Sequence, residues 1–263
     1  MHEAARTHPA GTEAPMTEAD RTEAARTEAV SAEAVSTEAA GTRAAGIRIF
    51  KDPVSSWTHF VAFWIAVVCA TALVWRVADD GTKAIGMGIY GATLALLFLA
   101  SSLYHWFDIG ERGNRWLRRL DHAAIFLLIA GTYVPPLLHL LDGAWRIVFL
   151  SLVVGIAVAG ALLKILWIDC PGWLGLTLYL GLGYIVVIPA PIIFPQLTTG
   201  AAAWLVGGGV AYTLGAFVYA GRWPDPWPDR FGHHEIWHLF VIAGAAAHYV
   251  FTLGLVDQPY PPF

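Results

Sequence analysis

Three histidines of the chain have the spacing and position of metal ligands. His234 and His238 stand four residues apart, so both rings lie on one face of a helix, separated by about 6 Å of rise. His105 ends an apolar stretch that would cross a membrane, where an ionisable residue is costly and indicates function. Three imidazoles with an open fourth position form the ligand set of a catalytic zinc site. We therefore expect zinc at His105, His234 and His238.

Two further polar side chains are candidates for catalysis. Asp121 precedes an apolar stretch, and a carboxylate beside a zinc ion can orient or deprotonate a water molecule whose pKa the metal has lowered. Ser101 shares a helix face with His105 and can supply a supporting hydrogen bond. Each residue also has a plainer interpretation. Asp121 can be an acid at a helix start beside basic residues, and Ser101 can bond to its own helix.

The segment His234-Glu235-Ile236-Trp237-His238 also spells His-Glu-x-x-His, the zincin protease signature, in which the glutamate is the base. That interpretation needs a third ligand, but the next histidine lies about 15 Å further along the helix. We therefore favour another kind of hydrolase and leave the roles of Glu235 and His233 open. We expect the remaining histidines of the apolar stretches to pack between helices: His59, His122, His139 and His248.

The elements that must position these residues are membrane helices. Hydrophobic residues make up 57% of the 263 residues and charged ones 14%, far from a soluble average. Asp, Glu, Lys and Arg are absent from six long stretches: 53–75, 84–107, 122–141, 147–163, 170–221 and 236–256. About 20 apolar residues cross a bilayer, so 170–221 crosses twice, divided at 192–200 by Pro and Gly. We predict an all-α integral membrane protein with seven transmembrane helices, forming one domain over 47–263.

Counting crossings places the candidate residues on one side of the membrane. The second helix ends at His105, the third begins at Asp121-His122 and the seventh begins at His233. The end of an even helix and the starts of two odd helices share one face, whichever way the protein is oriented. Basic residues near the span ends favour this face by ten to three: Arg43, Arg48, Lys51, Arg112, Arg115, Arg118, Arg119, Lys164, Arg222 and Arg230 against Arg76, Lys83 and Arg146. This bias predicts a cytoplasmic site and N-terminus, with the C-terminus outside.

The rest of the sequence limits the function further. Residues 1–46 repeat a unit of five, Thr-Glu-Ala-x-x, without large apolar side chains to bury, and we expect a disordered low-complexity tail. The net charge of −4 comes from scattered acids, so nothing suggests nucleic acid as a partner. Cys69 and Cys170 are far apart and are expected to be unpaired. Membrane lipids are the expected partners, and the sequence does not define an oligomeric state.

The same segments resemble the hemolysin III family, the bacterial branch of the progestin and adiponectin receptor (PAQR) superfamily. The resemblance covers roughly residues 50–255 and rests on Ser101-Ser102-Leu103-Tyr104-His105, the run beginning Leu120-Asp121-His122, and the segment 234–238. It implies zinc held by the three histidines, with Asp121 and Ser101 in the family's aspartate and Ser-x-x-x-His motifs. It also implies a multi-pass protein of the bacterial cell (inner) membrane.

The PAQR superfamily includes zinc-dependent ceramidases and other lipid-amide hydrolases, and its bacterial members are described as hemolysins or as regulators of membrane lipid homeostasis. The residues and the resemblance together predict a zinc-dependent hydrolase of a lipid amide or ester, involved in membrane lipid homeostasis. One alternative is a non-catalytic, receptor-like regulator in which zinc only ties helices together. A third alternative is a cytolysin. It is the weakest of the three, because the spans offer no polar stripe that could line a pore.

Overall fold

The structure, a computed structural model, describes residues 18, 23, 26, 48–227 and 230–257. The tail predicted over 1–46 lies outside the described residues, apart from three positions. The longer helices are α2 (Pro53–Arg76), α3 (Gly81–Trp106), α4 (Gly110–Leu140), α5 (Gly143–Leu166), α6 (Gly172–Tyr184), α8 (Thr199–Gly221) and α9 (His233–Leu253). Shorter elements are the strands β1 (Arg48–Ile49) and β2 (Phe107–Asp108), the 3-10 helices η1 (Ile185–Val187) and η2 (Phe194–Gln196), and α7 (Ala190–Ile193).

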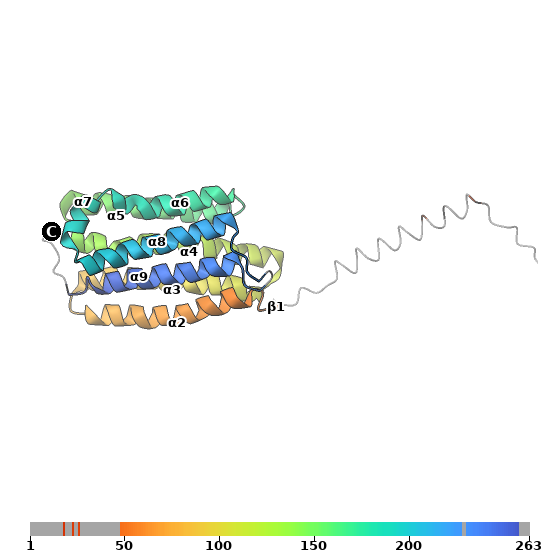
Figure 1. Ribbon diagram of the computed structural model, residues 1–263, viewed down its shortest axis with the longest axis horizontal. Helices are drawn as coiled ribbons and strands as arrows, with labels where there is room; N and C mark the ends of the chain where they lie inside the picture. The colour runs from red at the N-terminus through yellow and green to blue at the C-terminus, as the bar shows by residue number, and fades with distance from the viewer. Residues whose placement is uncertain (1–17, 19–22, 24–25, 27–47, 228–229, 258–263) are drawn as a thin grey trace, which may run out of the picture. The chain divides into compact units, whose positions relative to one another are not determined.

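The predicted fold class, an all-α multi-span membrane protein, is confirmed. Six helices are long and apolar enough to cross a membrane, and the bent pair Gly172–Val187 and Ala190–Gln196 gives a seventh span when counted as one. The long helices run side by side along a common direction, with α9 beside α8 and α2 (Figure 1). Large apolar side chains such as Ile65, Val68 and Phe217 point outward, as lipid-facing surfaces require.

The fifth span is broken, which the sequence analysis did not predict. The helical path changes from α6 to η1 and bends by 43° before α7, near Pro189 and Pro191. Proline lacks a backbone donor and clashes with the preceding turn, so it interrupts a helix. The hydroxyl of Tyr133 on α4 forms hydrogen bonds with backbone groups at the break. It donates to Gly183 O at 2.6 Å and accepts from Val186 N–H at 3.0 Å. A side chain from another helix thus makes the break tolerable in lipid.

The third span begins earlier than the sequence analysis placed it. Asp121-His122 was expected to start the helix, but α4 starts at Gly110, so Asp121 lies about three turns inside it. The absence of charge marks the apolar part of a helix, and α4 continues beyond that part into a basic segment. Arg115 Nη2 lies 2.9 Å from Glu111 Oε1, an i,i+4 pair that supports these first turns.

Close helix contacts at glycine hold α9 in place. At Gly215 of α8, an added Cβ would lie 2.6 Å from Phe240 Cβ and 2.8 Å from Trp237 Cε3 on α9. Only glycine fits there without displacing a neighbour, as is common where membrane helices approach closely. Trp237 and Phe240 occupy the α8 side of α9, and His238 is buried toward the bundle interior. This packing sets the rotation of α9 about its own axis.

Candidate metal centre

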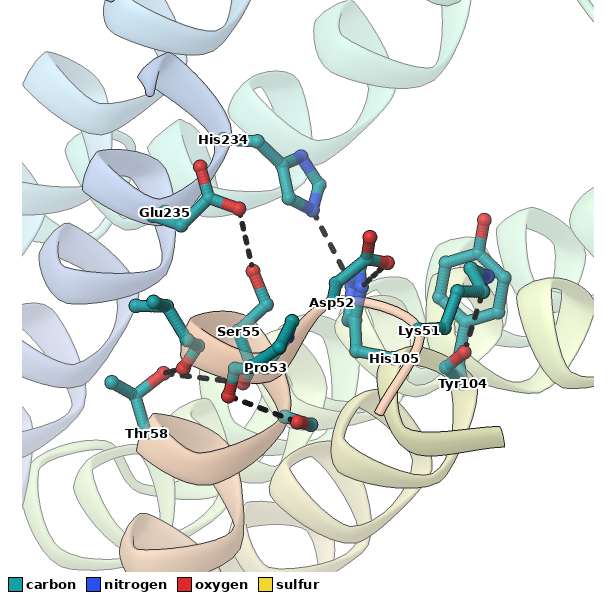
Figure 2. Close-up of polar contacts among 11 residues, drawn as sticks. Lys51, Asp52, Pro53, Ser55, Thr58, Tyr104, His105, His234 and Glu235 are labelled. Atoms are coloured by element: carbon teal, nitrogen blue, oxygen red, sulfur yellow. Dashed lines mark hydrogen bonds and ion pairs between the residues drawn. The ribbon is translucent and has the colours of Figure 1, made fainter. Parts of the chain in front are cut away.

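The structure brings His105, His234 and His238 into one cluster. Their candidate ligand nitrogens all lie within 4.8 Å of one another. Nε2 of His105 and Nε2 of His234 are 3.3 Å apart. Figure 2 shows the two rings facing each other across this contact. The rings of His105 and His238 are each only 3% exposed. Residues 129 positions apart in the chain therefore meet at one end of the bundle, where α3 ends and α9 begins.

This cluster fits a metal ion of the zinc type. Zinc–nitrogen bonds of about 2.05 Å in a tetrahedron place two ligand nitrogens about 3.3 Å apart, the spacing seen between His105 and His234. Imidazole nitrogen suits zinc and its transition-metal neighbours, whereas magnesium and calcium prefer oxygen. The three histidines lie close enough to bind a metal ion.

Asp52 fixes the orientation of His105, and the sequence analysis missed it. Asp52 Oδ2 lies 2.8 Å from His105 Nδ1, and Asp52 N–H donates to His105 O at 2.9 Å (Figure 2). Burial alone would raise the pKa of Asp52, but the hydrogen bond from His105 and nearby positive charge lower it below the ordinary value. An ionised Asp52 accepts the Nδ1 proton, which leaves the Nε2 lone pair of His105 directed at the cluster.

The backbone beside Asp52 is locked to the segment that follows His105. Strand β1 pairs antiparallel with β2, with Arg48 opposite Asp108 and Ile49 opposite Phe107. Lys51 Nζ donates to Tyr104 O at 3.2 Å and lies 3.7 Å from the centre of the Tyr104 ring. Burial lowers the pKa of Lys51, although neighbouring carboxylates oppose the shift. These contacts hold the residues before α2 against the last turn of α3.

Glu235 makes structural contacts on both carboxylate oxygens. Oε2 accepts from Gly232 N–H at 2.8 Å, which caps the start of α9. Oε1 accepts from Ser55 Oγ at 3.1 Å, a contact marked in Figure 2. Glu235 therefore ties α9 to α2 and sets the height of His234 and His238 relative to α3. These hydrogen bonds are those of a capping residue, so the structure offers no support for Glu235 as a protease base.

Asp121 and Ser101 lie together beside the cluster. Both side chains are buried, at 8% and 2% exposure, and come from α4 and α3. The Ser101 hydroxyl is a hydrogen-bond partner of Asp121, and His105 lies close enough to interact electrostatically with the same carboxyl group. The structure thus places both predicted catalytic residues next to a predicted ligand. Their catalytic roles stay predictions.

The other histidines lie at several distances from the cluster. His59 of α2 stacks on His238, with ring centres 3.9 Å apart, so it packs against a candidate ligand. His233 points to the preceding loop, its Nδ1 3.9 Å from Asp225 Oδ1. His139 Nδ1 lies 2.7 Å from Pro135 O, and His248 Nε2 lies 3.1 Å from Leu205 O. His248 thus bonds from α9 to α8, as expected, whereas His139 bonds within its own helix α4.

Asp52 carried no spacing signal that would identify it. It stands before the first span, next to Pro53, and forms no motif with His105. Its position at the start of an odd helix places it on the same membrane face as the other candidates. Crossing parity, applied to every acid near a span end, would have included it.

Comparison with known proteins finds a matching family and several relatives of this chain. Residues 47–249 match the family described as haemolysin-III related. The chain is 30% identical over 205 residues to a hemolysin-3 homolog of Bacillus subtilis (strain 168), covering 77% of this chain and 93% of that protein. It is 28% identical over 198 residues to hemolysin-3 of Bacillus cereus, covering 74% and 87%. It is also 28% identical over 216 residues to the human monocyte to macrophage differentiation factor, covering 76% and 82%.

Proposed function

Since the chain belongs to the haemolysin-III-related family of membrane proteins, we propose that it is a zinc-dependent hydrolase of a lipid amide or ester in the bacterial cell membrane, serving membrane lipid homeostasis. The observation that carries this proposal is the meeting of three imidazoles with a buried carboxylate. His105, His234 and His238 cluster at one end of the bundle, and Asp121 with its partner Ser101 lies beside them.

Each side chain has a defined part in this proposal. His105, His234 and His238 would hold the zinc ion, and Asp52 keeps His105 in the tautomer that binds metal through Nε2. A bound zinc ion supplies Lewis acidity at this place. Asp121 accepts a proton from the attacking water and returns it to the leaving group. Ser101 holds the Asp121 carboxylate in position by a hydrogen bond.

A lipid substrate follows from where the site lies. The outer surface of the helices is apolar, so acyl chains surround the bundle at every side. The cluster lies at the end of two membrane helices, the depth at which the ester or amide linkages of membrane lipids are found. The predominance of basic residues on this side favours the cytoplasmic leaflet.

A second candidate function rests on the helices that supply the ligands. His105 belongs to α3, whereas His234 and His238 belong to α9. A metal ion would therefore link two helices that are far apart in the sequence. In a homeostasis regulator or receptor-like protein, the same ion serves only to hold the bundle together. Both functions use the same three histidines to bind the metal ion, but only the hydrolase converts a lipid substrate.

Metal analysis followed by lipid analysis tests the proposal. We expect purified protein to carry about one zinc ion per chain, and His105→Ala and His238→Ala to carry almost none. His248→Ala, which changes a histidine bonded to Leu205 O, is the matched control and keeps the metal. The wild-type protein in lipid vesicles should form a lipid product that chelator abolishes. Zinc without any chelator-sensitive product supports the structural function, and absence of metal contradicts both.

A further inference from the structure

A pocket on the first turns of α4 is lined by three arginines and a tryptophan. Its lining residues, here called the arginine pocket, are Glu111, Arg112, Arg115, Trp116 and Arg119, and its volume is about 430 Å³. That size lies within the range of small-ligand pockets, roughly 300–1,000 Å³. Three guanidinium groups against one carboxylate give the pocket a net positive charge.

The spacing of these residues directs them to one side of the helix. Arg115, Trp116 and Arg119 follow Arg112 by three, four and seven positions, which places all four on one face. Asp121 comes two positions after Arg119, about 200° further around the axis. The arginine pocket therefore faces away from the metal cluster, and the two sites are independent.

Two of the arginines differ from Arg115 in their ion pairing within the described part of the transmembrane region. Arg115 pairs with Glu111 and Asp169 at 2.9 Å and 3.4 Å. Within residues 48–227 and 230–257, neither Arg112 nor Arg119 has a carboxylate at salt-bridge distance. Arg119 lies against Trp116, with Cζ 4.8 Å from the ring centre, and its Nε is buried without a hydrogen-bond partner. The guanidinium groups of Arg112 and Arg119 are therefore not neutralised by a carboxylate among these residues, and an anion from outside the protein can pair with them.

The pocket lies at the depth of lipid headgroups. With 31 residues, α4 is about 46 Å long, whereas the hydrocarbon core of a bilayer is about 30 Å thick. Its apolar part begins after Asp121, so residues 110–120 extend beyond the hydrocarbon. Trp116 and Leu120 are half exposed beside the arginines, and indole rings favour the membrane interface. The pocket thus offers positive charge and an apolar edge side by side.

We propose that the arginine pocket binds the phosphodiester of an anionic phospholipid headgroup, in the leaflet on the side where α4 begins. Arg112 and Arg119 supply the charge-assisted hydrogen bonds to the phosphate oxygens. The acyl chains then lie along the apolar surface of α4 beyond Leu120. An anionic lipid fits better than a zwitterionic one, because the excess positive charge of the pocket needs a net negative ligand.

Titration of the purified full-length protein tests this proposal. The probes are short-chain, water-soluble phosphatidylglycerol, phosphatidylcholine of the same chain length, and inorganic phosphate. We expect phosphatidylglycerol to bind at least tenfold more tightly than the other two. Arg112→Gln with Arg119→Gln should weaken it roughly thirtyfold, since each basic side chain near an anionic lipid contributes about fivefold. Arg112→Lys with Arg119→Lys keeps the positive charge but loses the planar guanidinium group. This variant should weaken binding less than the double glutamine variant does.

The control removes two positive charges elsewhere, by Arg76→Gln with Arg222→Gln. This variant should bind phosphatidylglycerol as the wild type does, since the ion pair of Arg76 with Asp257 is exposed and lies outside the pocket. All variants should melt within a few degrees of one another, which shows that a loss of binding is not a loss of folding. Equal loss in both double variants would mean nonspecific attraction and would overturn the site. Equal affinity for inorganic phosphate and phosphatidylglycerol would overturn the lipid as its ligand. Neither result bears on zinc or turnover, so the proposed function is tested separately.

Discussion

Asp52 precedes the first span and His105 lies at the end of the second, and Asp52 Oδ2 is 2.8 Å from Nδ1 of His105. The carboxylate occupies the ring nitrogen that points away from the other histidines. In metal sites such a carboxylate fixes the histidine tautomer and raises its basicity, so Asp52 completes the candidate site although it touches no metal.

Replacing Asp52 therefore weakens metal binding without removing a ligand. We expect Asp52→Asn to lower zinc affinity about 10- to 100-fold, because the amide no longer provides a charged acceptor for the Nδ1 proton. Competition with a chelator of known affinity measures the change. Asp169→Asn is the control, since Asp169 pairs with Arg115 and Arg118 and does not contact the histidines. Unchanged zinc affinity in Asp52→Asn would rule out the positioning role.

A substitution of Asp121 distinguishes the proposed hydrolase from a protein in which the metal ion is only structural. We expect Asp121→Asn to keep zinc and the melting temperature but to lower turnover at least 100-fold, because the amide cannot accept the proton of the attacking water. Ser101→Ala should reduce turnover less, since it removes only a supporting hydrogen bond. Product formation is measured with the lipid identified by the chelator experiment. Full activity in Asp121→Asn would show that another group is the base.

A substitution of Glu235 tests the protease interpretation of the His-Glu-x-x-His segment. We expect Glu235→Gln to retain most of the turnover, whereas loss of a catalytic base abolishes it. Its stability should fall by about 1 kcal/mol, because the hydrogen bonds to Gly232 and Ser55 lose their charged acceptor. Turnover and thermal unfolding, measured on the same preparation, check both expectations. Ser55→Ala is the matched variant and should destabilise the protein by a similar amount.

The break in the fifth span depends on Tyr133. We expect Tyr133→Phe to destabilise the protein by about 1–3 kcal/mol, because Val186 N–H and Gly183 O lose their partner in an apolar surrounding. The melting temperature in detergent measures the effect. Tyr184→Phe, which removes an exposed hydroxyl bonded to Thr213, is the control and should change the melting temperature little. Equal effects of the two variants would contradict the role of Tyr133.

Much of the fold could be predicted, because one physical rule governs membrane helices. Lipid excludes charge from about 20 residues at a time, so the charge-free stretches gave spans close to α2, α3, α5 and α9. The same rule cannot show a helix that continues into water, and so it missed the first turns of α4. It also missed the bend near Pro189. Whether the helix breaks there depends on whether a side chain such as Tyr133 forms hydrogen bonds with the backbone groups that lose their helical partners.

The site was predictable where the number of crossings fixed the position of a residue. Parity brought His105, His234 and His238 to one face, and the structure confirms that they meet. Parity also places Asp52 on this face, but it does not show the contact of Asp52 with His105. That contact lies beside the pairing of β1 with β2, two residues each, outside any span. The contacts of Glu235 with Ser55 and Gly232 likewise depend on how α9 packs on α2. Such details follow from packing, which a single sequence does not display.

The division of the ligands between α3 and α9 also sets an order for biosynthesis. His105 leaves the ribosome 129 residues before His234, and α9 follows the other helices that the structure describes. A nascent chain that has not yet inserted α9 holds one of the three histidines and cannot form the cluster. The candidate site therefore forms only once α9 has inserted, so a metal ion bound by all three histidines would mark a chain whose α9 has reached the membrane.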